Sequence, residues 1–112
     1  RKKWFPSRAS PNRAMTRLES RLAALAAAGE TATYGALARE LGMRMAELTA
    51  ALEALMEEDA RAGQPLRAAL CKGRFAGGLP ARGFFDKAAE LGYDTSDAAA
   101  FVALHRRRLS CG

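Results

Sequence analysis

The sequence has no long apolar run. Its longest ones, such as residues 22–28, fall far short of the roughly 18 residues that a membrane span needs. It also does not open with the basic, apolar and small-residue pattern of a secretory signal. We therefore expect no membrane association and a cytoplasmic location.

Cysteine and histidine are scarce as well. Cys71 and Cys111 lack the paired spacing of a zinc or dithiol site, so we expect a small core residue and a tail thiol rather than a disulfide. The single histidine, His105, has no regularly spaced cysteine or carboxylate partner for a metal site or proton relay. We therefore predict no catalytic residue, no metal and no cofactor.

What the sequence does have is a globular composition with uneven charge. Its 112 residues, 49% hydrophobic and 27% charged, suffice for one domain with a core, and the richness in alanine and arginine is typical of bacterial proteins. The net charge is +6, with seven bases and one acid in residues 1–21, four bases and seven acids in residues 22–71, and seven bases and four acids in residues 72–112. Basic ends favour an anionic partner such as nucleic acid, and solubility alone is the alternative.

The N-terminal region divides into an arm and a helix. Residues 1–11 contain two prolines and four bases without a helical period, and we interpret them as a basic flexible arm or a leader. Residues 12–112 are predicted to form a single domain. Its first helix spans about residues 12–28, because apolar residues recur there at spacings of three and four. Three bases, spaced by four, share one face of this helix: Arg13, Arg17 and Arg21.

Two further helices follow, with recognisable ends. Thr33 can cap a helix over residues 34–41, and Gly42 can end it in the left-handed conformation. A third helix is predicted over about residues 45–61, stopped by Gly63 and Pro65.

This pair of helices resembles a helix-turn-helix, and specifically that of winged-helix domains. Gly42 occupies the turn, and small Ala38 lies at the position where the two helices cross closely. The remaining apolar positions of the motif are occupied by Leu37, Leu41, Met43, Leu48 and Ala51.

The following segments suit a wing and extra helices. Residues 66–71 can form a strand, residues 72–78 a glycine-rich turn, and residues 79–84 the return strand of a hairpin. A helix from about Phe84 would end at Gly92, and Ser96 or Asp94 can cap a last helix. The predicted fold is mainly α with a small β-hairpin, a winged helix-turn-helix with extra C-terminal helices.

The run TYGALARELG also looks like a helix entry in alkylguanine-DNA alkyltransferases. Those proteins carry a reactive cysteine in a Pro-Cys-His-Arg motif, whereas Cys71 lies between Leu70 and Lys72. Without this motif we do not expect Cys71 to act as a reactive cysteine, and the resemblance leaves at most a shared winged-helix scaffold.

The winged-helix resemblance implies binding of nucleic acid, mainly double-stranded DNA, by a transcriptional or chromosome-associated regulator. The third helix would enter the major groove with Arg44 and Thr49 near the bases, a sparse set for direct readout. Backbone contacts would dominate, and RNA remains an alternative to DNA. The candidate backbone-binding residues are Arg13, Arg17, Arg21, Lys72, Arg74 and Arg82.

Other functions stay open from the sequence. The same fold can serve as a protein-protein interaction module without DNA binding, in which the acids at residues 57–59 would select a basic partner. A homodimer through the first and last helices is a further alternative.

Overall fold

A computed structural model describes the backbone of residues 9–111 and the side chains of residues 15–111. Of the predicted arm, residues 1–8 lie outside this range, and residues 9–11 already belong to the first helix. The elements in chain order are α1 (Ala9–Ala28), β1 (Ala32–Thr33), α2 (Tyr34–Leu41), α3 (Met45–Ala62), a turn of 3₁₀ helix η1 (Arg67–Leu70), β2 (Cys71–Lys72), α4 (Arg82–Glu90) and α5 (Ala98–Cys111). None of these helices is both long and apolar enough to cross a bilayer.

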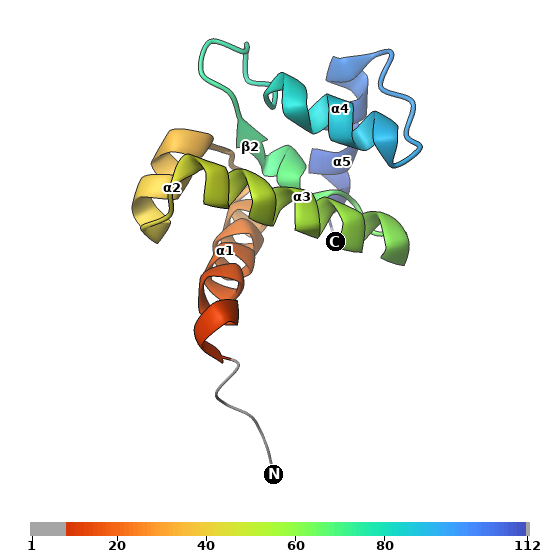
Figure 1. The fold of residues 1–112 in the computed structure, drawn as a ribbon. Coiled ribbons are helices and arrows are strands. Elements are labelled where there is room, and N and C mark those ends of the chain that lie inside the picture. The colour runs from red at the N-terminus through yellow and green to blue at the C-terminus, as the bar shows by residue number, and fades with distance from the viewer. Residues whose placement is uncertain (1–8, 112) are drawn as a thin grey trace.

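The helices pack around the short segment formed by η1 and β2. Figure 1 shows α3 crossing the molecule, α2 beside its first turns and α4 along its second half. α1 and α5 contact each other, and η1 contacts α1, α3 and α5. The apolar stripes of the first and last helices are therefore covered within one chain, which leaves less apolar surface for the dimer considered from the sequence.

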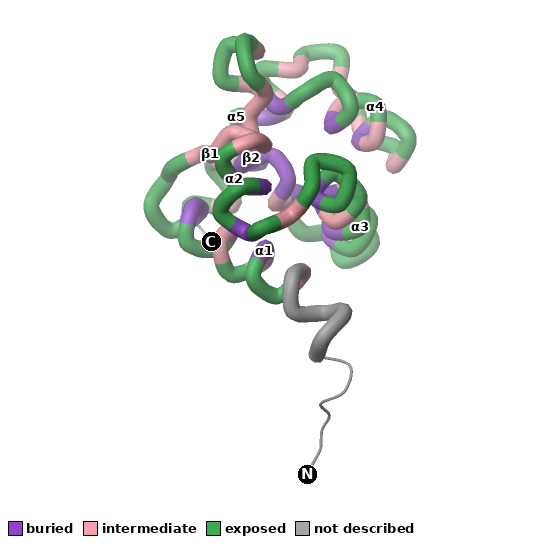
Figure 2. Tube along the Cα trace, turned by 60° about the vertical axis from the view of Figure 1, so that its left-hand side comes forward, coloured by how far each residue is buried: buried purple, intermediate pink, exposed green. Residues whose placement is uncertain are grey.

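The core is formed mainly by leucines at helical spacing. Figure 2 shows buried positions on the inner faces of the helices, and Cys71 of β2 is buried as well. The buried residues include Leu18, Leu22 and Leu25 of α1, Leu37, Ala38 and Leu41 of α2, and Leu48, Leu52, Leu55 and Met56 of α3. Met43 and Ala51 are partly buried against this core. The helical period therefore predicted the inward faces of α1, α2 and α3 correctly.

The ends of α2 and α3 follow the expected capping chemistry. The Thr33 hydroxyl oxygen accepts a hydrogen bond from the Ala36 N–H at 3.2 Å, which pairs a donor that the first helical turn leaves open. Gly42 ends α2 with a left-handed φ of +67°. α2 has the predicted bounds, and α3 is one residue longer than predicted.

The predicted β-hairpin is wrong. β1 and β2 pair in parallel, with Ala32 opposite Cys71 and Thr33 opposite Lys72. Most of the apolar run predicted as a strand is η1, and residues 79–84 pass through a buried Pro80 into α4. A run that is buried on all sides shows no period, so its sequence does not distinguish a strand from a helical turn.

The β2–α4 loop, residues 73–81, replaces the hairpin. The Gly73 N–H donates to the Leu79 carbonyl at 2.8 Å, which closes the loop at its base without a return strand. Its N-terminal end continues β2 and its C-terminal end leads directly into α4, so the loop projects from the body beside α2 (Figure 1).

The last helix is capped by Asp97, not by Ser96 or Asp94. The Asp97 carboxylate accepts from the Ala100 N–H at 3.1 Å, and α5 begins one residue after Asp97. Asp94 instead accepts from the Ser96 N–H at 3.0 Å in the preceding turn.

Candidate nucleic-acid interface

A hollow rimmed by arginines lies between α2, the β2–α4 loop and the start of α4. Its volume is ≈ 680 Å³, and its walls include Arg39 from α2, Arg74 from the loop and Arg82 from α4. We call it the arginine hollow. Elements far apart in the sequence thus bring three cations to one concave surface.

Helix N-termini add to the positive potential of the arginine hollow. Residues 33–36, which start α2, and residues 81–82, which start α4, line it together with Met45, the first residue of α3. The first turn of a helix has backbone N–H groups without intrahelical acceptors, and the helix dipole makes this end positive. The hollow is therefore positive from its backbone as well as from its side chains.

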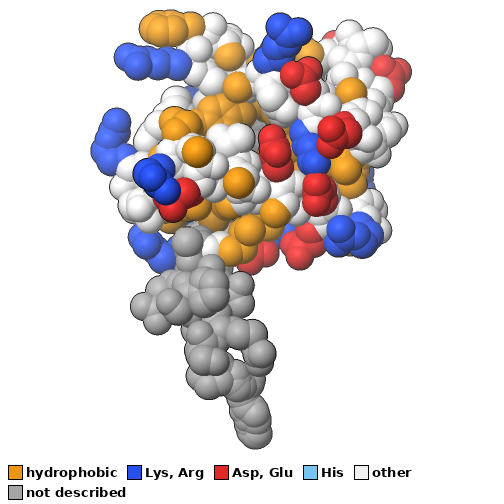
Figure 3. All heavy atoms as spheres, in the orientation of Figure 1, with side chains coloured by type: hydrophobic (Ala, Val, Ile, Leu, Met, Phe, Trp, Pro, Cys, Tyr) orange, Lys and Arg blue, Asp and Glu red, His pale blue; other side chains and the backbone are white. Residues whose placement is uncertain are grey.

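The cations at this end of the molecule have few acidic neighbours. Among the described residues, Arg39, Lys72 and Arg74 have no ion-pair partner. Arg82 has only a loose contact with Asp86, at 3.9 Å between exposed side chains. In Figure 3, several blue side chains stand over α2 and the β2–α4 loop, and most of the red ones lie over the second half of α3 and α4, with blue ones among them.

The acidic residues at the end of α3 are neutralised within the chain. Glu57 lies 2.6 Å from the Lys87 ammonium group of α4. Asp59 is buried, and Arg67 donates to it from both its backbone N–H and its side chain, at about 3 Å. Arg67 also pairs with Glu58 at 2.8 Å and with Glu19 at 3.0 Å. Hydrogen bonds to these carboxylates raise the pKa of Arg67 further above neutral pH. This end is therefore a set of internal contacts, which weakens the case for a basic partner there.

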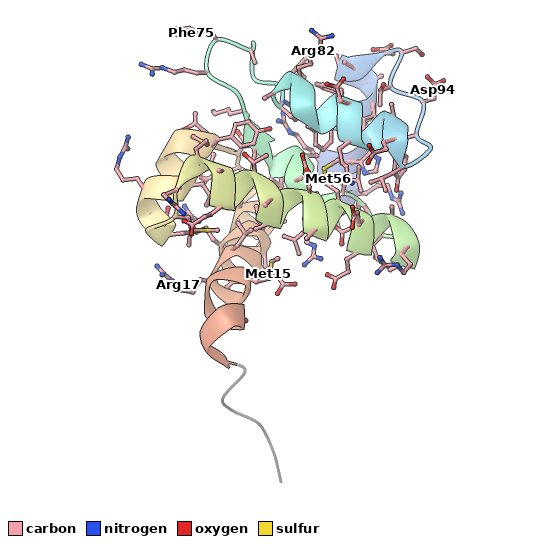
Figure 4. The ribbon with its side chains drawn as sticks, viewed as in Figure 1. Met15, Arg17, Met56, Phe75, Arg82 and Asp94 are labelled. Atoms are coloured by element: carbon pink, nitrogen blue, oxygen red, sulfur yellow. The ribbon has the colours of Figure 1, made fainter. Side chains whose placement is uncertain are left out.

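Two residues of α1 that were predicted to bind nucleic acid contact α2 instead, and neither lines the arginine hollow. Arg17 donates to the carbonyl oxygens of Leu41 and Glu40, at 3.3 and 3.4 Å, at the C-terminal end of α2. Arg21 lies 2.6 Å from the Glu40 carboxylate. Figure 4 shows Arg17 well below Phe75 and Arg82, which belong to the opposite end of the molecule. The side chain of Arg13 lies outside the described residues.

The remaining predicted residues do not line the hollow, although Arg44 and Lys72 directly precede residues that do. Arg44 precedes α3 with a side chain that is 86% exposed, and only a 3.7 Å contact with Glu47 restrains it. Thr49 is exposed on α3 and lines a neighbouring apolar pocket. Lys72 is half-buried in β2, immediately before the β2–α4 loop.

Sequence reasoning missed Arg39 and the apolar pocket. Arg39 shares a helical face with Ala36 and lies away from buried Leu37 and Leu41, which is the signal that could have identified it. The pocket, ≈ 220 Å³ between α3 and α4, is lined by residues that include Met56, Phe84 and Met45. Its lining comes from segments up to 50 residues apart, so no local pattern indicates it.

Tyr34 forms part of the wall of both concavities. Tyr34 lines the arginine hollow and the apolar pocket, and its hydroxyl oxygen accepts from the Ala81 N–H at 3.0 Å. Burial raises the pKa of Tyr34, so the hydroxyl stays neutral at physiological pH. This hydrogen bond joins the start of α2 to the start of α4 and fixes their N-termini relative to each other.

His105 and Cys71 are both buried. The Nδ1 of His105 accepts from the Leu66 N–H at 2.9 Å. Burial lowers the pKa of His105 and raises the pKa of Cys71 to about 12, so both groups are neutral at pH 7. Cys71 is buried and Cys111 exposed, and both thiols are free. The described part of the chain contains no group of three potential metal ligands.

No protein-family model, curated protein or solved structure matches this chain. The candidate interface therefore rests on its own geometry and charge.

Proposed function

We propose that this protein binds nucleic acid, in the first place double-stranded DNA, through contacts between the arginine hollow and the phosphate backbone. The observation that carries the proposal is the meeting of Arg39, Arg74 and Arg82 with the starts of α2 and α4 around one hollow. Arginine and helix N-termini are both favoured partners of phosphate. A transcriptional or chromosome-associated regulator would use such a surface.

The arrangement of α2 and α3 supports a helix-turn-helix role within this proposal. The exposed residues at the N-cap and in the first turns of α3 are Arg44, Met45, Ala46, Glu47, Thr49 and Ala50. This set contains one base and few groups that can read base edges, so direct readout by α3 would be weak. The β2–α4 loop would take the place of a hairpin wing.

The test is fluorescence anisotropy of a labelled random-sequence duplex at ~50 and ~200 mM salt. We expect binding that weakens steeply with salt. Replacing Arg39, Arg74 and Arg82 together by alanine should lower the slope of log K against log salt by roughly 3, since each phosphate contact contributes about 0.9.

The matched control removes the same charge elsewhere. Arg61, Arg107 and Arg108 are exposed, and none of them lines the arginine hollow. Their triple alanine variant should keep the slope of the wild-type protein. Equal losses in the two triple variants would mean that net charge alone drives binding, and absence of binding at low salt by the folded protein would refute the proposal.

A second candidate function is a protein-interaction module, which the apolar pocket between α3 and α4 favours. Met45 on its rim is 50% exposed, and Phe84 and Met56 form part of its apolar wall. A partner would insert one apolar side chain there. If the folded protein fails to bind duplex, a pull-down with wild type and Met45→Glu as paired baits would test this alternative: a partner captured only by wild type supports it.

A further inference from the structure

Phe75 is the most exposed large apolar side chain in the described part of the molecule. It is 96% exposed, compared with 50% for Met45 and 43% for Leu104. Figure 4 shows it at the tip of the β2–α4 loop, pointing away from the body. A phenylalanine held so fully in water gains nothing from the core and is available to a partner.

The loop holds Phe75 outward with an unfavourable backbone conformation. Residues 73–76 form a tight turn in which the Ala76 N–H donates to the Gly73 carbonyl at 3.3 Å. Phe75 occupies the third position of this turn with a left-handed φ of +60°, where glycine or asparagine is the favoured residue. The hydrogen bond between Gly73 and Leu79 closes the loop behind it at 2.8 Å. The ring is therefore presented by a closed loop and not by a loose chain.

One cation, Arg74, lies against the ring. The Arg74 guanidinium carbon lies 5.4 Å from the centroid of the Phe75 ring, within the range of a cation–π contact. Arg74 and Ala76, the residues on either side of Phe75 in the chain, both line the arginine hollow, whereas Phe75 itself does not. A ligand whose phosphates enter the hollow would meet the aromatic ring beside them.

This combination suits a duplex better than a bilayer surface. A membrane-inserting tip gathers several apolar side chains, but the neighbours of Phe75 in the loop are Arg74, Ala76, Gly77 and Gly78. A single apolar wedge flanked by arginine is the arrangement with which proteins separate stacked base pairs from the minor groove.

Resting on the proposed DNA binding, we propose that Phe75 inserts as a wedge between adjacent base pairs and kinks the duplex, while Arg74 and the arginine hollow hold the neighbouring phosphates. Flexible pyrimidine–purine steps such as TA unstack most easily, so they would be preferred sites. Sequence preference would then come from DNA deformability, which compensates for the few base-reading groups on α3.

The experiment uses the full chain and a short duplex with a central TA step. A fluorophore pair on the duplex ends reports bending, and 2-aminopurine beside the TA step reports unstacking. The variants are Phe75→Ala, which removes the wedge, and Phe75→Leu, which keeps an apolar wedge. The matched control is Leu104→Ala, since Leu104 is an exposed apolar residue on α5.

We expect wild type and Leu104→Ala to raise energy transfer between the ends and 2-aminopurine fluorescence. Phe75→Ala should bind the TA duplex about tenfold more weakly, a loss of the size found for removing an aromatic–base stack, and should lose both signals. Its salt slope should remain that of wild type, because its phosphate contacts remain. Phe75→Leu should retain a fraction of both signals.

The failures of the two proposals are distinguishable. No binding of any duplex by wild type would refute the DNA-binding function and this inference with it. Binding with the expected salt slope, but with bending that Phe75→Ala leaves unchanged, would overturn the wedge alone. The wedge would also be overturned if wild type cosedimented with anionic vesicles, Phe75→Ala did not, and both proteins bent the duplex equally. That result would assign the ring to a membrane surface.

Discussion

The charged side chains around the two ends of α3 differ in whether they are paired. At its start, the arginine hollow gathers cations that have no ion-pair partner or only a loose one among the described residues. At its end, Asp59, Glu57 and Glu58 are paired with Arg67 and Lys87. Charged side chains lie around both ends, but only the arginine hollow offers unbalanced charge to a ligand. We therefore expect substitutions at the end of α3 to affect folding, and substitutions at its start to affect binding.

Removing Arg67 should have the largest effect on stability. Its side chain bonds Asp59, which is only 6% exposed, and also reaches Glu58 and Glu19. Arg67→Ala leaves a buried carboxylate without its cation, so we expect the free energy of unfolding to fall by about 3 kcal/mol. Urea denaturation followed by circular dichroism measures this change. A loss below about 0.5 kcal/mol would show that the cluster behaves as an ordinary exposed ion pair.

His105 should give a smaller effect together with a dependence on pH. His105→Leu leaves the buried Leu66 N–H without its acceptor, which costs about 2 kcal/mol. Because burial lowers the pKa of folded His105 below its value of 6.5, the unfolded chain takes up the proton first as the pH falls. The contribution of His105 to stability is therefore fully present above pH 6.5 and declines below it, until the pH falls past the lower folded pKa.

Urea midpoints measured from pH 7.5 downward test this sign. Wild type should lose stability as the pH falls below 6.5, and His105→Leu should lose less over the same range. Stability that rises in wild type on acidification would contradict a lowered pKa. Asp94, whose pKa is lowered by hydrogen bonds from Ser96, titrates at more acidic pH and leaves this window clear.

Arg17 tests whether the basic face of α1 is structural. Its guanidinium group donates to two carbonyl oxygens at the C-terminus of α2, so Arg17→Ala should cost about 1 kcal/mol. Duplex affinity should change little, because Arg17 does not line the arginine hollow. A variant of unchanged stability with strongly weakened duplex binding would reverse this assignment and restore α1 as a phosphate-facing helix.

The smallest stability effects should come from the arginine hollow itself. Arg39 and Arg74 are exposed, so Arg39→Ala and Arg74→Ala should each change the free energy of unfolding by less than about 0.5 kcal/mol. Denaturation on the same samples used for anisotropy provides the comparison. A destabilisation as large as that of Arg67→Ala would show that the two ends of α3 do not differ in the way described.

The sequence was informative where structure depends on local periodicity and caps. Leu37, Leu48 and Thr33 follow from spacing and helix-end chemistry alone, and the bounds of α2 follow with them. The strand pairing did not follow, because Cys71 pairs with Ala32 across 39 residues and η1 is apolar throughout its buried residues 68–70.

The candidate site was only partly predictable, because charge depends on long-range partners. Arg74 and Arg82 were identified as bases, but only the fold brings them together with Arg39. Arg21 was also predicted from its charge to contact the phosphate backbone, yet it pairs with Glu40 from another helix. Counting charges along the chain therefore predicts which cations are available to a ligand only where no acid or carbonyl group from a distant segment binds them.

The short η1 turn also has a consequence for how the protein unfolds. Its neighbouring amides are paired with separate helices: the Leu66 N–H with His105 of α5 and the Arg67 N–H with Asp59 of α3. Arg106 of α5 further donates to the Ala69 carbonyl at 2.7 Å. Since these bonds break only when several helices separate, hydrogen exchange at these two amides should require global opening. The slowest-exchanging backbone of this mainly helical chain would then lie in a four-residue turn and the residue before it, outside the long helices.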